Sequence, residues 1–119
     1  MIDICVDEAY AFDYYAIMEL KFHKGAIPEL LLKKLKYKIT KQIGLELFKT
    51  IMTSDEYKKL YAANSHTFDA VDKAKTNQLT AQEVDKTNYE RMLAKKTLQN
   101  KFFKNKLSEK KIGYETYEK

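Results

Sequence analysis

Glycine and proline are scarce in this chain, and their scarcity constrains its fold more than any other feature. Only 3 Gly and 1 Pro occur among 119 residues. Sheets need frequent turns, which these residues favour, whereas long helices need few turns. Lysine, leucine and glutamate, which favour helices, are frequent in the chain. We therefore predict an all-α fold with few, long elements.

Length and composition indicate one globular domain. A chain of this size can bury roughly two thirds of its unfolded surface. The hydrophobic fraction of 45% is too high for disorder, and the charged fraction of 33% is too high for a membrane protein. No apolar run of about 18 residues occurs, so we expect no membrane partner.

The amino-terminal residues and the cysteine usage favour a cytoplasmic location. The first six residues include Asp3 and no basic residue, which is not the pattern of a secretory signal. The chain has 1 Cys, Cys5, which can form no internal disulfide. This usage suits a reducing compartment.

The first predicted helix follows a short extended arm. Residues 2–6 alternate in polarity, and Asp7 can cap a helix that runs to about Lys24 and stops at Gly25. This helix is apolar nearly all round, so we expect it to be buried on more than one side.

The second predicted helix has the most regular pattern. Pro28 suits its first position, and Gly44 interrupts it, where we expect a close helix contact. Its apolar stripe is Leu31, Leu35, Ile39, Ile43 and Leu47. Its opposite face is basic: Lys33, Lys34, Lys36, Lys38 and Lys41.

Two capping boxes mark the starts of the third and fourth helices. These boxes are Thr53 with Glu56, and Thr80 with Glu83. The third helix should end near residues 75–77, and the fourth should run over about 81–107. We predict a single domain over residues 1–113 and a loose tail over 114–119. The two middle helices should form an antiparallel hairpin, with the first and fourth packed on it.

The net charge of +5 is unevenly distributed along the chain. Residues 1–32 carry −4, residues 33–49 carry +5, residues 50–90 carry −2, and residues 91–119 carry +6. In one interpretation, antiparallel packing brings opposite charges together. In the other, the basic segments form a surface for nucleic acid or another polyanion.

The segment from residue 68 to residue 84 resembles half of an EF-hand calcium site. Asp72 and Glu83 would be the first and last ligands of the loop. However, Ala74, Thr76 and Asn77 stand where two further ligands and a glycine belong. We therefore interpret the segment as a helix–turn–helix in which Glu83 is a cap, and we expect no metal.

The fourth helix has polar residues in the middle of its core-facing stripe: Asn88, Arg91 and Lys95. Burying such a cation without a partner would cost several kcal/mol. The structural interpretation pairs them with Asp13 or Glu19 of the first helix. The functional alternative is an anion site, with Arg91 as forked donor, Lys95 as point charge and Asn88 as orienting group.

Signals for catalysis are poor. His23 and His66 do not have metal-ligand spacing, and no glycine-rich phosphate loop is present. Cys5 lies near Asp3 and Asp7, which disfavour a reactive thiolate. We predict no catalytic residues and no cofactor.

Two segments carry a family resemblance. Residues 13–21, Asp-Tyr-Tyr-Ala-Ile-Met-Glu-Leu-Lys, and the pattern of Asp85, Asn88, Arg91 and Lys95 resemble recurrent segments of an uncharacterised family of short helical proteins from marine bacteria and phages. The spacing from Glu8 to Asp13 departs from the family pattern. The resemblance implies no known activity, but it pairs the acidic segment with the polar stripe.

The first helix is apolar nearly all round, and the chain has 9 Tyr, which suit helix interfaces. Together these two features predict a non-enzymatic interaction or structural protein that self-associates. The alternative is a small basic nucleic-acid-binding protein that uses the second-helix lysines and the fourth helix. A third possibility is a protein that binds an anionic or phosphorylated ligand at Arg91 and Lys95.

Overall fold

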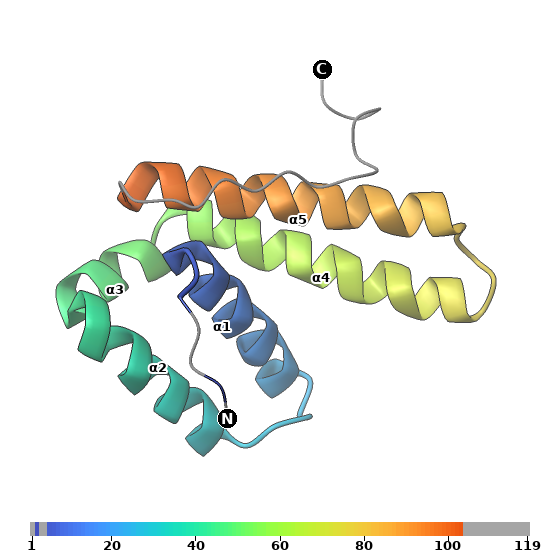
Figure 1. Cartoon of the computed structure of the whole chain (residues 1–119). Coiled ribbons are helices and arrows are strands. Elements are labelled where there is room, and N and C mark those ends of the chain that lie inside the picture. The colour runs from blue at the N-terminus through green and yellow to red at the C-terminus, as the bar shows by residue number, and fades with distance from the viewer. Residues whose placement is uncertain (1, 3–4, 104–119) are drawn as a thin grey trace.

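The computed structural model describes residue 2 and residues 5–103, which contain five helices and no strand (Figure 1). The helices are α1 (Glu8–His23), α2 (Glu29–Ile43), α3 (Leu45–Met52), α4 (Asp55–Lys75) and α5 (Ala81–Phe102). The all-α class is thus confirmed for this part of the chain, and the predicted count of four helices is wrong. Residues 3 and 4 of the predicted arm and the whole predicted tail lie outside the described residues.

The fifth helix arises because Gly44 divides the second predicted helix. Its φ of 92° and ψ of 150° are open to glycine and strained for other residues. A Cβ built on Gly44 would meet nothing within 4 Å, so the expected close helix contact is wrong. Pro28 precedes α2 as its N-cap rather than opening it. Backbone conformation, and not close packing, is therefore the reason for glycine here.

The ends of the later helices are partly as predicted. The Thr80–Glu83 capping box is present, with Glu83 Oε2 accepting from the Thr80 N–H at 2.9 Å. At α4 the cap is Ser54, whose Oγ accepts from the Tyr57 N–H at 3.1 Å, so the predicted box at Thr53 is wrong by one residue. Thr53 instead donates to the Lys49 carbonyl at the end of α3.

The antiparallel hairpin of the fold is formed by α4 and α5, which lie side by side along their lengths (Figure 1). Helix α1 packs on both of them and on α2, while α3 joins α2 to the start of α4. The predicted hairpin of the two middle helices is therefore wrong. The chain turns at Gly44, and α1 occupies the place beside α4 that α2 was expected to fill.

The core surrounds Phe12 of α1, which is completely buried. Its ring lies 5.9 Å from the Phe48 ring and 6.4 Å from the Phe103 ring, centroid to centroid. Helix α5 ends at Phe102, earlier than predicted, and the extended backbone at Phe103 accompanies this aromatic contact. None of the helices in the described ranges is long and apolar enough to span a bilayer.

Candidate functional site

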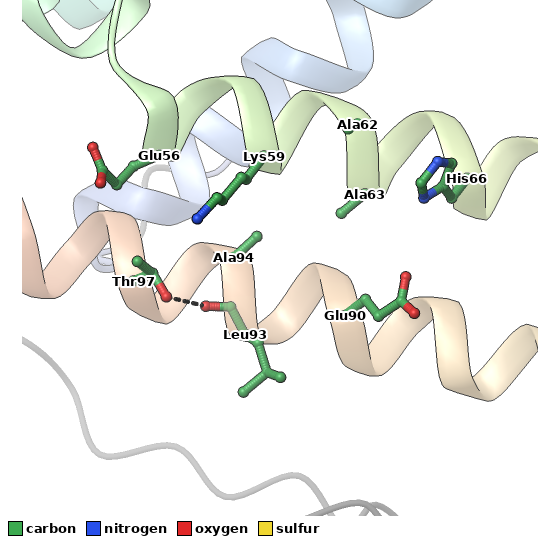
Figure 2. A pocket seen from close by; sticks show the side chains of 9 residues that line it. All are labelled: Glu56, Lys59, Ala62, Ala63, His66, Glu90, Leu93, Ala94 and Thr97. Carbon is green, nitrogen blue, oxygen red and sulfur yellow. Dashed lines mark hydrogen bonds between the residues drawn. The ribbon is translucent and has the colours of Figure 1, made fainter.

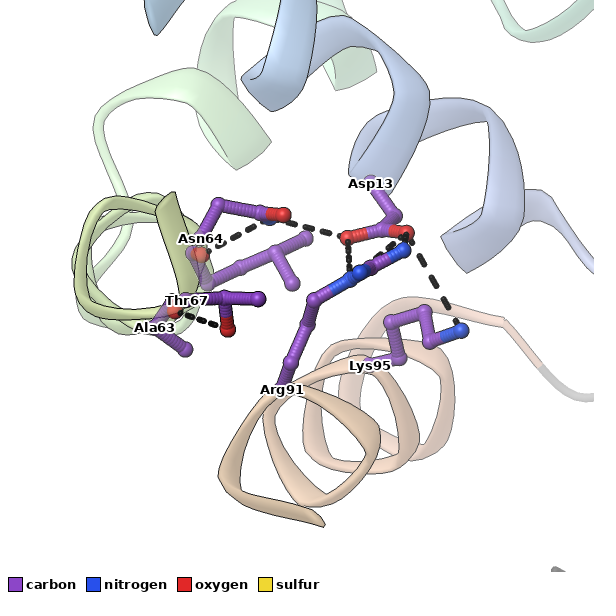
Figure 3. Close-up of polar contacts among 7 residues, drawn as sticks. Asp13, Ala63, Asn64, Thr67, Arg91 and Lys95 are labelled. Atoms are coloured by element: carbon purple, nitrogen blue, oxygen red, sulfur yellow. Dashed lines mark hydrogen bonds and ion pairs between the residues drawn. The ribbon is translucent and has the colours of Figure 1, made fainter. Parts of the chain in front are cut away.

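A buried carboxylate joins three helices of the bundle. Asp13 of α1, with its side chain 7% exposed, meets Asn64 of α4 and Arg91 of α5 (Figure 3). Arg91 donates from Nε to Oδ1 at 3.1 Å and from Nη2 to Oδ2 at 2.9 Å, a forked pair. Asn64 Nδ2 donates to Oδ1 at 2.8 Å, and Lys95 Nζ lies 3.9 Å from Oδ2. We call these four residues the Asp13 cluster.

The Asp13 cluster contains two cations and one carboxylate. Arg91 is 28% exposed at its side chain and Lys95 only 12%, so the arginine can share its charge with solvent more readily. The Lys95 ammonium also lies 4.3 Å from the centre of the Tyr10 ring, a cation–π contact that partly replaces lost hydration. The arrangement is that of a structural polar network whose arginine fork is already occupied by a carboxylate.

Two residues that the sequence grouped with this stripe lie elsewhere. Asn88 is within 3.5 Å of the Val84 carbonyl of its own helix, and Glu19 accepts from the Tyr57 hydroxyl at 3.1 Å. Burial, followed by the negative charge of Glu19, raises the pKa of Tyr57, so its hydroxyl remains a donor well above neutral pH.

Sequence reasoning missed two buried amides. Asn64 is a polar residue among the buried, mostly apolar positions of α4, and that polar residue is the signal that could have found it. Gln99 of α5 accepts from the Ala9 N–H at 2.8 Å and donates to Glu8 at 3.2 Å. It thereby satisfies a backbone donor in the first turn of α1, a role for which the sequence holds no local signal.

A groove of about 350 Å³ runs between α4 and α5 (Figure 2). Small residues occupy its middle, namely Ala62, Ala63 and Ala94. Leu93 stands at its edge with 45% of its surface exposed. Glu56, Lys59 and Thr97 lie at one end, and His66 and Glu90 lie at the other (Figure 2). We call this the α4–α5 groove.

The lysines of the second predicted helix are all exposed on α2. Lys33 pairs with Glu29 at 3.5 Å, and Lys36 Nζ lies 5.7 Å from the centre of the Phe48 ring. The other three are Lys34, Lys38 and Lys41. Tyr37 is 66% exposed among them.

The histidines and the cysteine form no catalytic constellation within the described ranges. The His23 Nδ1 atom is 2.9 Å from the Tyr61 hydroxyl, and His66 lies at the end of the α4–α5 groove. Cys5 is a free, exposed thiol. No group of three or more His, Cys, Asp or Glu side chains suited to a metal ion occurs among the residues that the structure describes.

Comparison of the chain with protein-family models, with curated proteins and with solved structures finds no match in any of the three. The resemblance of the two polar segments to a family of short helical proteins therefore stays a prediction. What can be inferred about function comes from the surfaces and contacts of the molecule itself.

Proposed function

We propose that this is a non-enzymatic interaction protein that associates with a second copy of itself through the α4–α5 groove. One observation carries the proposal. Leu93, a large apolar side chain, stands 45% exposed beside a strip of alanines that leaves room for another side chain. The leucine and the alanines together form a contiguous apolar surface, and such surfaces mark interaction sites where they are large.

The shape of the groove suits a symmetric pair. Alanine side chains allow a facing helix to approach closely, and a leucine from that helix can fill the space above them. In a two-fold dimer each copy supplies both the leucine and the alanine strip. Leu93 of each subunit then lies against the groove of the other.

The charges at the groove are complementary under the same two-fold rotation. Lys59 of α4 and Glu90 of α5 lie at diagonally opposite corners of the groove face (Figure 2). A two-fold axis that lies in the plane of the contact, perpendicular to the line from Lys59 to Glu90, brings each Lys59 over a Glu90 of the other copy. The contact is made twice, which favours this register over one in which the two charges do not meet.

The hairpin face is large enough for a specific dimer. Helix α4 has 21 residues and α5 has 22, so each is roughly 30 Å long at a rise of about 1.5 Å per residue. Two helices side by side offer a face of roughly 600 Å² per copy, a total of about 1,200 Å², the lower end of specific interfaces.

Light scattering on a size-exclusion column tests the proposal. The wild-type chain should elute at about twice 14.0 kDa at high micromolar concentration. Leu93→Asp should give a monomer that is still helical, because it places a charge in the dimer contact. Leu45→Asp, at a similarly exposed leucine of α3, is the matched control and should remain dimeric. A wild-type monomer under these conditions refutes self-association, while a dimer that Leu93→Asp leaves intact refutes this interface.

A further inference from the structure

The outer face of α2 combines an exposed aromatic ring with a set of lysines. Tyr37 is 66% exposed and Leu30, seven residues earlier on the same face, is 61% exposed. Lys33, Lys34 and Lys41 are four before, three before and four after Tyr37. In a helix these spacings place their side chains around the tyrosine. We call the tyrosine, these lysines and Lys38 the α2 basic face.

The charge of this face is poorly compensated within the described part of the chain. Glu29 is the only acidic residue of α2, and it pairs with Lys33. No acidic partner for Lys34, Lys38 or Lys41 is found among the residues that the structure describes. Because Lys34 and Lys38 are four residues apart, they repel one another on the helix surface. A bound polyanion would remove this repulsion.

A second copy of the chain does not suit the α2 basic face. A two-fold contact there would bring like charges together, which is unfavourable. An aromatic ring surrounded by flexible cations instead fits a strand of phosphates whose bases are unpaired, because every base offers a flat face for stacking. A duplex hides those faces, so a single strand suits the exposed tyrosine better.

We propose that the α2 basic face binds single-stranded nucleic acid without strong sequence preference. Lys33, Lys34, Lys38 and Lys41 neutralise successive phosphates, and one base stacks on Tyr37. This function is separate from self-association, since α2 lies apart from the α4–α5 groove (Figure 1). The Asp13 cluster takes no part, because the fork of Arg91 is occupied by Asp13.

Fluorescence anisotropy with a labelled oligo-dT strand tests the proposal on the full chain. Three or four phosphate contacts predict that log K falls against log salt with a slope of about −2 to −3. Tyr37→Leu keeps an apolar side chain and removes the ring, so it should weaken binding roughly tenfold with the slope unchanged. Oligo-U, measured alongside, tells whether RNA binds as well as DNA.

The lysines are tested with a matched pair of variants. Lys34→Gln, Lys38→Gln and Lys41→Gln together should abolish most of the salt dependence. Lys58→Gln, Lys73→Gln and Lys75→Gln together remove the same charge from exposed positions of α4 and should bind nearly as wild type. Thermal melting should show that both proteins are folded, because all six lysines are exposed.

Three results would overturn the proposal. Equal losses in the two triple variants would mean that only net charge matters. Undiminished binding by Tyr37→Leu would remove the stacked base. Binding to vesicles rich in anionic lipid, without binding to oligo-dT or oligo-U, would assign the face to a membrane surface instead.

Discussion

Removing the Asp13 carboxylate from water costs free energy, and the hydrogen-bond donors around it offset that cost. A carboxylate removed from water needs several donors, and here Asn64 and Arg91 supply three hydrogen bonds shorter than 3.2 Å. The helix spacing explains why Glu19 could not share the site. It is six residues further along α1, which is roughly 9 Å along the axis and on a different face.

The two-to-one ratio of cations to carboxylate predicts an order of mutational costs. Asp13→Asn leaves two cations close together and should destabilise the fold most, by about 3–5 kcal/mol. Arg91→Met leaves a neutral pair of Asp13 with Lys95 and should cost less, about 2–3 kcal/mol, since Arg91 is 28% exposed. Lys95→Met leaves the forked pair intact and should cost least, about 1 kcal/mol.

Urea unfolding of the three variants gives the order directly. Adding phosphate at constant ionic strength should not stabilise wild type more than chloride does, because the arginine fork is occupied. If Arg91→Met were as stable as wild type, and wild type alone were stabilised by phosphate, the cluster would be an anion site and not a structural one.

At the scale of elements, the sequence predicts where helices end better than it predicts which helices pack against each other. Gly25, Pro28 and the Thr80–Glu83 box act within a few residues of themselves, so the sequence alone locates the boundaries near them. Periodicity shows which face of a helix is apolar and cannot show which helix covers it. The hairpin was therefore assigned to the wrong pair, and the cap that Gln99 of α5 provides to α1 was missed.

Gly44 supplies the prediction at this scale. Its φ of 92° with ψ of 150° lies in a region that is nearly restricted to glycine. Gly44→Ala should therefore destabilise the protein by about 1–3 kcal/mol, although no atom obstructs the new methyl group. Gln42→Ala, an exposed change two residues away, is the control and should be nearly neutral in chemical denaturation. A Gly44→Ala protein as stable as wild type would show that α2 and α3 can continue as one helix.

At the scale of the whole molecule, the alternating charges of the chain have different partners. Some pair within the molecule, as Lys101 does with Glu56, 3.3 Å apart, across the α4–α5 hairpin. Others lie on the surface, on α2 and at the corners of the α4–α5 groove. Charge sums over segments did not separate these uses, because each helix turns a different face to each neighbour.

The diagonal corners of the groove give the last prediction, which concerns the register of the proposed dimer. Lys59→Glu places two carboxylates opposite each other twice in the dimer, and Glu90→Lys does the same with two ammonium groups. Each single reversal should weaken association by about 1–2 kcal/mol, because exposed pairs are individually weak and the two-fold axis repeats them. Sedimentation equilibrium measures the dimer dissociation constant. Lys58→Glu, the same charge change on α4 outside the groove lining, should have little effect.

The double variant restores attraction at both contacts and should recover the wild-type constant. An equimolar mixture of the two single variants should also recover it, since a heterodimer faces glutamate with lysine at both corners. Raising the salt concentration should shrink all of these differences. Reversals that weaken association without rescue in either the double variant or the mixture would contradict the pairing of Lys59 with Glu90, while leaving self-association itself in place.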